Sequence, residues 1–140
     1  MTLLVLIAQR VADDHLLASL RDAGFDGITK AHGLVFEMLD PEGSRVTDMA
    51  RRARMTKQGM GQLVQAVERM ELVERVPDPT DGRAQLVRLT SRGTQAVAAA
   101  RRGSAGLERI WRERLGERRY QATREALVDL AVATGLEHVR

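Results

Sequence analysis

The stretch that decides the fold runs from Met55 to Gly93 and reads MTKQGMGQLVQAVERMELVERVPDPTDGRAQLVRLTSRG. In its first part, apolar residues recur at spacings of three and four, which is the period of an amphipathic helix. Thr56 stands where the N-cap of that helix is expected. We therefore predict a helix over 57–70 with one buried stripe, made of Met60, Leu63, Val67 and Met70.

Two short apolar runs follow this helix, over 72–76 and 86–89, and between them lies PDPTDGRAQ. Because Pro, Asp and Gly are frequent in turns, the two runs predict a β-hairpin with a long polar tip. Upstream, residues 45–53 predict a short helix joined to the helix over 57–70 by a tight turn. Two short helices joined in this way form a helix-turn-helix, and a hairpin directly after them makes it a winged one.

Longer helical patterns flank this module. Apolar spacing predicts a first helix over 3–23, and Thr29 is expected to cap a second helix. Thr90 is expected to cap a long helix that Gly116 ends, and a last helix follows. The terminal apolar stripes exceed what one small winged module can cover, so we expect them to join two copies of the chain in an intertwined homodimer.

The expected fold class is thus mainly α (α+β), a winged helix-turn-helix with flanking N- and C-terminal dimerisation helices. The chain has 140 residues, enough for a single domain. Within it we expect the winged helix-turn-helix DNA-binding part over 28–93 and the dimerisation helices over 1–25 and 94–140.

Composition excludes several classes of protein. Hydrophobic residues make up 44% and charged residues 29%, which is typical of a globular chain. There is no cysteine, which removes disulfides and thiol-based redox sensing. The opening MTLLVLIAQR lacks the features of a signal peptide and is too short to span a membrane. We read it as the buried face of the first helix and expect a cytoplasmic protein with no membrane partner.

No constellation of residues indicates an enzyme. We find no phosphate-binding loop, no metalloprotease motif and no nucleophile with a positioned base, so we expect no catalytic residue and no cofactor. The three histidines, His15, His32 and His138, are far apart and have no carboxylates at metal-binding spacing. His32 is a candidate for lining a ligand pocket beside the second helix, although a structural histidine is the commoner case.

Positive charge is concentrated in the middle of the chain. Residues 45–92 hold ten basic and six acidic side chains, a balance of +4, whereas the remainder holds 12 basic and 13 acidic side chains, a balance of −1. A surface that meets phosphates is expected to gather charge in this way. Ordinary solvated charge would explain the count equally well.

The face of the 57–70 helix opposite Leu63 carries glutamines and cations, with no acid among the first nine residues of the helix. Gln can pair bidentately with adenine, Lys can reach guanine or phosphate, and Gly61 would let the main chain approach the groove wall. A plain solvated face is the alternative. The candidate DNA-reading residues are Thr56, Lys57, Gln58, Gly61, Gln62, Gln65 and Arg69, and the candidates for contacts to the DNA backbone are Arg45 and Arg54.

In the hairpin, Arg83 follows Asp81 and Gly82. A guanidinium at the end of such a loop can enter a narrow, electronegative minor groove. We expect Asp81 to orient Arg83 by a charge-assisted hydrogen bond. The alternative is a turn stabilised by an Asp–Arg pair that has no role in DNA binding.

These residues resemble the winged helix-turn-helix of the multiple-antibiotic-resistance regulator (MarR) family. The family's wing has an Asp, one residue, an Arg, and then an apolar strand that leads to Leu-Thr-x-x-Gly. Here Asp81, Arg83, Leu89, Thr90 and Gly93 stand in those places. The resemblance implies a dimeric repressor or activator of transcription that binds double-stranded DNA, and we expect a repressor. The symmetry of the expected homodimer predicts an inverted-repeat operator. The resemblance also implies release by a small effector, frequently aromatic or phenolic.

One residue departs from the family pattern. The family commonly has Gly where this chain has Glu71, just after the recognition helix. Glu71 must therefore adopt a strained left-handed conformation, at a cost of roughly 1 kcal/mol, or the helix must end differently. Because winged helices also mediate protein contacts, a winged-helix protein-interaction module without DNA binding is the alternative function.

Overall fold

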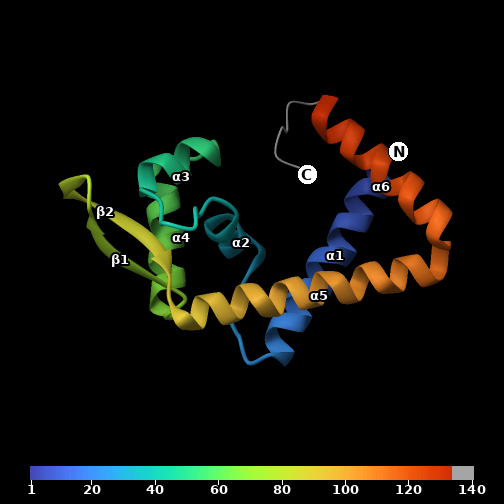
Figure 1. The fold of residues 1–140 in the computed structure, drawn as a ribbon, viewed down its shortest axis with the longest axis horizontal. Helices are drawn as coiled ribbons and strands as arrows, with labels where there is room; N and C mark the ends of the chain where they lie inside the picture. The colour runs from blue at the N-terminus through green and yellow to red at the C-terminus, as the bar shows by residue number, and fades with distance from the viewer. Residues whose placement is uncertain (134–140) are drawn as a thin grey trace. The chain divides into compact units, whose positions relative to one another are not determined.

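The computed structural model describes residues 1–133, and this part of the chain contains six helices and one two-stranded antiparallel sheet (Figure 1). His138 and the end of the expected 94–140 segment lie outside the described residues. The predicted order of helices and hairpin is confirmed. Along the chain the elements are α1 (Thr2–Asp22), α2 (Lys30–Glu37), α3 (Val46–Arg52), α4 (Lys57–Arg69), β1 (Val73–Asp78), β2 (Asp81–Leu89), α5 (Ser91–Leu115) and α6 (Glu117–Ala133).

The chain forms two compact units, Met1–Gly103 and the residues from Ser104 onward. The first unit has an aliphatic core around α4, which contacts α2, α3 and β1. Burying one such side chain contributes about 1.5–3 kcal/mol. The largest fully buried side chains are Val35, Met49, Met60, Val64, Val67, Leu72 and Val87.

The buried stripe of α4 is centred one residue later than predicted. Met60 and Val67 are fully buried, as expected, but Val64 lies between them at the centre. Leu63 and Met70 are only partly buried and pack at the edge of the core. One residue is a rotation of about 100° on a helix, yet the polar face remains exposed because it lies opposite the whole stripe.

Three helices of the first unit begin with the caps that the sequence predicts. The Thr56 hydroxyl oxygen accepts a hydrogen bond from the Gly59 N–H at 3.0 Å, and that of Thr90 accepts one from the Gly93 N–H at 2.9 Å. At the start of α2, His32 Nδ1 accepts from the N–H of the cap residue Thr29 at 3.1 Å. Each cap satisfies a donor that the first turn of a helix leaves unpaired.

Glu71 is left-handed, with a φ of 60°. Of the two conformations expected for a Glu at this position, the structure therefore adopts the strained cap. The chain then reverses direction into β1, and the Thr90 hydroxyl donates a hydrogen bond to the Glu71 carbonyl at 2.6 Å. The Thr90 N–H donates to the Leu72 carbonyl at 3.1 Å. The end of α4 and the start of α5 are thus joined by main-chain contacts.

The polar hairpin tip is shorter than the expected stretch over 77–85, although the register shift leaves 82–84 without a cross-strand partner. β1 extends to Asp78 and β2 starts at Asp81, so that only Pro79 and Thr80 form the turn. Cross-strand pairing continues through the polar residues, with Pro77 opposite Gln85, and its register shifts between Pro77 and Asp78. Polar residues can continue a ladder because its hydrogen bonds are made by the main chain.

The apolar start of α1 is exposed in the chain's own structure, contrary to the expectation that it is a buried face. Five of its aliphatic side chains are between 48% and 69% exposed, whereas Leu20 near the helix end is buried. Aliphatic residues gathered at one helix end and left in water are unfavourable, so they call for a partner. The five residues are Leu3, Leu4, Leu6, Ile7 and Val11.

The second unit contains the end of α5 and all of α6. Gly116, left-handed with a φ of 73°, separates the two helices where the sequence predicts a break. The Arg112 guanidinium lies 4.7 Å from the ring centroid of the buried Tyr120, a cation–π contact that stabilises this turn. No helix between residues 1 and 133 has the length and apolar character needed to cross a membrane.

Candidate nucleic-acid interface

The side chains predicted from the sequence to read DNA lie at the N-cap and on the solvent side of α4. All of them are exposed except Gly61, which is partly buried and has no atom in the space where a Cβ would stand. Thr56 serves as the N-cap through its hydroxyl oxygen, and its hydroxyl proton can still be donated. The exposed members of this face are Thr56, Lys57, Gln58, Gln62, Gln65 and Arg69.

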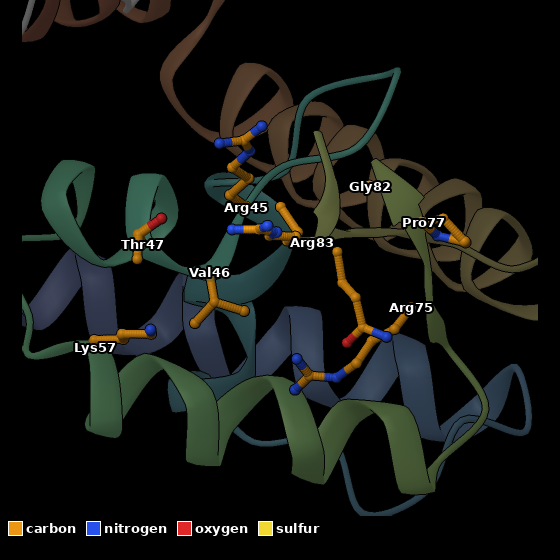
Figure 2. Close-up of a pocket in the computed structure, with 10 residues that line it drawn as sticks. Arg45, Val46, Thr47, Lys57, Arg75, Pro77, Gly82 and Arg83 are labelled. Carbon is orange, nitrogen blue, oxygen red and sulfur yellow. The ribbon is translucent and has the colours of Figure 1, made fainter. Parts of the chain in front are cut away.

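A groove of about 560 Å³ lies between the helix-turn-helix and the wing (Figure 2). Four cationic side chains line it, and no carboxylate does. A concave surface with this charge attracts anions. The lining residues come from α3 and its N-cap, the start of α4, and both strands: Arg45, Val46, Thr47, Lys57, Arg75, Pro77, Gly82, Arg83, Ala84 and Gln85.

Most basic residues of the 45–92 segment are already paired within the protein. Five arginines form ion pairs with acids, and Arg92 stacks over the Phe25 ring at 5.2 Å. The paired arginines are Arg45, Arg51, Arg52, Arg75 and Arg88. The other four basic residues of this segment have neither an ion pair nor an aromatic contact with any residue that the structure describes, and they lie on the helix-turn-helix or the wing: Arg54, Lys57, Arg69 and Arg83.

Asp81 shapes the turn instead of holding the Arg83 guanidinium. Its Oδ1 accepts a hydrogen bond from the Arg83 main-chain N–H at 3.1 Å, and its Oδ2 lies 3.7 Å from a guanidinium nitrogen of Arg45. The predicted charge-assisted bond to the Arg83 side chain is therefore absent from the contacts of this carboxylate. The Arg83 side chain is exposed and borders the groove.

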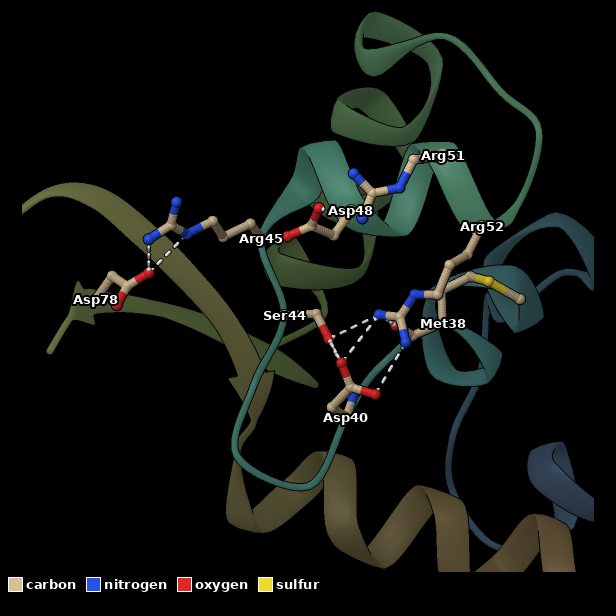
Figure 3. Close-up of polar contacts among 8 residues, drawn as sticks. All are labelled: Met38, Asp40, Ser44, Arg45, Asp48, Arg51, Arg52 and Asp78. Carbon is tan, nitrogen blue, oxygen red and sulfur yellow. Dashed lines mark hydrogen bonds and ion pairs between the residues drawn. The ribbon is translucent and has the colours of Figure 1, made fainter. Parts of the chain in front are cut away.

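Arg45 is bound to Asp78, at the far end of β1 (Figure 3). Arg45 Nε donates to Asp78 Oδ2 at 2.6 Å, and the Thr80 N–H and hydroxyl donate to Asp78 Oδ1 at 2.8 and 2.7 Å. The hydrogen bonds from Thr80, followed by that from Arg45, lower the pKa of Asp78 to about 2. The same ion pair raises the pKa of Arg45. The charge of this backbone-contact candidate is therefore largely neutralised, whereas Arg54 lies exposed in the turn before α4.

A second polar cluster fixes the loop before α3 (Figure 3). Arg52 donates to both Asp40 carboxylate oxygens at 2.9 and 3.1 Å, to Ser44 Oγ at 3.0 Å and to the Met38 carbonyl at 2.5 Å. The hydrogen bonds from Arg52 and Ser44 lower the pKa of Asp40. Local sequence patterns indicate neither this cluster nor the Arg45–Asp78 pair, because each joins residues from different elements.

His32 has a structural contact of its own. Its ring nitrogen caps α2 through the Thr29 N–H, and the residue does not line the groove. Its assignment as a ligand-pocket residue stays a prediction. In residues 1–133, no group of three or more His, Asp or Glu side chains is placed to hold a metal ion.

A helix-turn-helix followed directly by a two-stranded wing, with exposed cations on both, defines the winged helix-turn-helix class of fold, which many DNA-binding proteins use. Residues 26–84 match the model of the MarR family. This match covers α2, the helix-turn-helix and the first part of the wing. The winged helix-turn-helix fold inferred from the sequence is thereby confirmed, and the match agrees with the family that the wing motif suggests.

Solved structures share the fold over nearly the whole chain. RV1404 from Mycobacterium tuberculosis is 19% identical, with a TM-score of 0.78 over 99% of this chain and 95% of its own. The MarR family transcription regulator SP03579 is 20% identical, with a TM-score of 0.73 over 96% of this chain and 85% of its own. The S. aureus MepR–DNA complex is 20% identical, with a TM-score of 0.67 over 96% of this chain and 97% of its own. No curated protein sequence matches the chain.

Proposed function

We propose that this protein is a transcription regulator of the MarR type, which binds an inverted-repeat operator as a homodimer and represses transcription there. The observation that carries the proposal is the cationic groove between the helix-turn-helix and the wing. Lys57 at the start of α4 and Arg83 on the wing border one groove that no carboxylate lines. In this arrangement α4 enters the major groove, Arg83 reaches the adjacent minor groove, and Arg54 meets the DNA backbone between them.

In this proposal the side chains on the exposed face of α4 contact the DNA bases. Gln58 and Gln62 are one helical turn apart, and Gln65 and Arg69 continue the same exposed side. A Gln side chain can form two hydrogen bonds to adenine, and an Arg can form two to guanine. The small Gly61 leaves room for the main chain to approach the DNA.

The exposed apolar start of α1 supports the homodimer. Five aliphatic side chains gather there, and Leu127 and Val132 on α6 are also about half exposed. A second copy of the chain offers the same apolar surfaces, and a symmetric pair buries them together. Two recognition helices about 34–36 Å apart then read half-sites one helical turn apart. Sedimentation at micromolar concentration should give a dimer, and a monomer would contradict this part of the proposal.

A small aromatic effector is the proposed signal. The S. aureus regulator MepR, which shares the fold, has been solved with ethidium bromide as well as with DNA. Because this chain has no cysteine, its response must be non-covalent. Peroxide should leave DNA binding intact while the methionines remain unmodified by mass spectrometry. A panel of phenolic and cationic aromatic compounds, titrated into the DNA complex, tests for release.

Footprinting on the DNA upstream of the gene that encodes the protein tests the central proposal. A protected inverted repeat is expected, with half-sites about one helical turn apart. Random DNA of the same length is the control and should bind much more weakly. Equal affinity for both DNAs would contradict a sequence-specific operator, and reporter expression with and without the protein distinguishes repression from activation.

A further inference from the structure

The outer end of the wing is tied to the helix-turn-helix by one polar contact between distant residues. Arg45, the N-cap residue of α3, and Asp78, the last residue of β1, are 33 positions apart. Both Nε and a terminal nitrogen of Arg45 bind Asp78 Oδ2, at 2.6 and 2.5 Å. Asp78 is only 5% exposed, and its other oxygen is occupied by Thr80.

The Arg45–Asp78 contact lies at the outer end of the hairpin, where few other contacts stabilise it. A two-stranded sheet is marginally stable unless it packs against other elements. The inner end of the wing is buried at Val73 and Val87, and Ser44 pairs with Val87 by main-chain hydrogen bonds. Beyond this point the strands become exposed, and the guanidinium of Arg45 reaches across to the turn, where Asp81 is its second acidic neighbour at 3.7 Å.

We propose that Arg45 is a positioning residue, which holds the wing tip through Asp78 at the angle that sets Arg83 across the groove from Lys57. The inference rests on the proposed function in one respect, namely that Arg83 reaches DNA. It reassigns Arg45, whose position beside the groove otherwise suggests a direct contact with a DNA phosphate.

The two roles for Arg45 predict opposite effects of Asp78→Asn. If Arg45 binds phosphate, removing the charge of Asp78 releases the guanidinium and strengthens DNA binding. If Arg45 holds the wing, the same substitution weakens its tie and weakens DNA binding. Asp78 is buried and acidic, so it has no favourable contact of its own with DNA to lose.

The experiment measures operator affinity for Asp78→Asn, Arg45→Met and the double variant by fluorescence anisotropy. Each single variant should bind about tenfold more weakly, the loss expected when one hydrogen bond between charged groups is removed. The double variant should be no weaker than the single ones, because both act through one contact. Arg45→Lys keeps a cation within reach of Asp78 and should recover part of the affinity.

The preference for A/T-rich flanks provides a readout that a general loss of stability would not change. A narrow A/T-rich minor groove attracts an inserted Arg, so a displaced Arg83 should lose that preference in both single variants. The matched control is Arg51→Met, because Arg51 pairs with Asp48 on the same helix and has no contact with the wing. Tighter binding by Asp78→Asn, or unchanged flank preference in Arg45→Met, would overturn the proposal.

Hydrogen exchange in the absence of DNA separates this proposal from the function on which it rests. The main-chain amides from 80 to 85 should exchange about tenfold faster in Asp78→Asn and Arg45→Met than in the parent. The amides of α4 should be unchanged and serve as the internal reference. Unchanged exchange in the wing would overturn the positioning role even if the parent binds its operator. If the wing amides exchange faster in the two variants than in the parent, but the parent binds no DNA, only the proposed function is refuted.

Discussion

Gly93 lies so close to Leu72 that a Cβ on Gly93 would overlap the Leu72 carbonyl oxygen. The same carbonyl accepts a hydrogen bond from the Thr90 N–H at 3.1 Å. The first turn of α5 therefore packs directly on the main chain that leaves α4. This contact explains, in physical terms, why a Leu-Thr-x-x-Gly pattern follows the wing: the Thr caps α5 and bonds to the end of α4, and the Gly allows the approach.

Gly93→Ala should destabilise the protein by about 3 kcal/mol or more, because the backbone must move to admit the methyl group. Denaturant unfolding measures the change. Gly61→Ala is the matched control, since nothing lies within 4 Å of the position of its Cβ. In the interior of α4 it should stabilise by about 0.5–1 kcal/mol. Equal stability of the two variants would show that the Gly93–Leu72 contact relaxes at little cost.

Glu71→Gly should stabilise the protein by about 1 kcal/mol, because Gly adopts the left-handed conformation of this residue without steric strain. Thermal unfolding followed by circular dichroism provides the measurement. Glu71→Ala tests the cause, since Ala removes the carboxylate but keeps the Cβ. A gain in Glu71→Ala as large as that in Glu71→Gly would assign the effect to charge and not to the backbone.

Acid should weaken the fold partly through Asp78. Its pKa in the folded protein is lowered from 3.8 to about 2, so its charged form stabilises the fold. This contribution is complete above the unfolded-state pKa and is lost as the pH falls through the folded-state pKa. Between about pH 5 and about pH 2, the melting temperature of the parent should therefore fall more steeply than that of Asp78→Asn. Parallel curves would contradict the shift.

Arg83→Ala should reduce affinity for the operator and make its salt dependence shallower. Each phosphate-neutralising charge contributes about 0.9 to the slope of log affinity against log salt, so a dimer should lose up to about two. Arg88→Ala is the matched control on the same strand, because Arg88 is held by Glu74 at 2.8 Å. It should change the slope little. If Arg83→Ala binds as tightly as the parent throughout the salt titration, the wing does not contact DNA.

Gln62→Ala should weaken binding to the operator more than binding to random DNA. A bidentate base contact contributes about 1–3 kcal/mol of discrimination. Competition anisotropy with both DNAs measures the ratio. Gln95→Ala, at an exposed position on α5, is the control and should leave the ratio unchanged. Equal losses on operator and random DNA would limit Gln62 to a backbone contact.

Local patterns in the sequence predict a large part of this structure. The period of the apolar residues gives α4 and its exposed face, and the caps at Thr56 and Thr90 follow from residue type and position. The left-handed conformation of Glu71 is one of the two alternatives that comparison with the family's motif gives. Each of these features depends on residues within a few positions of one another, so the sequence carries the signal directly.

Features that depend on distant partners could not be predicted in this way. Nothing near Arg45 indicates that its partner is Asp78, and the opposite charges of the segment allow many pairings. Proximity in the sequence suggests a bond between Asp81 and the Arg83 side chain, whereas the Asp81 carboxylate accepts from the Arg83 main-chain N–H. Strand length was underestimated for the same reason, since polar residues join a ladder only when a partner strand is present.

The short turn of the wing should limit the conformational entropy that the protein loses when it binds its operator. The turn consists of two residues, and the Asp78 side chain holds Thr80 by two hydrogen bonds. A loop that is disordered before binding loses conformational entropy when it settles on DNA, whereas in the strands of this wing only the bulge at 82–84 has no cross-strand partner, so the loss is confined to these residues. Immobilising the Arg83 side chain should cost only about 0.5–1.5 kcal/mol. Calorimetry of operator binding should accordingly show a heat capacity change set by buried surface alone, without the added contribution of a folding segment.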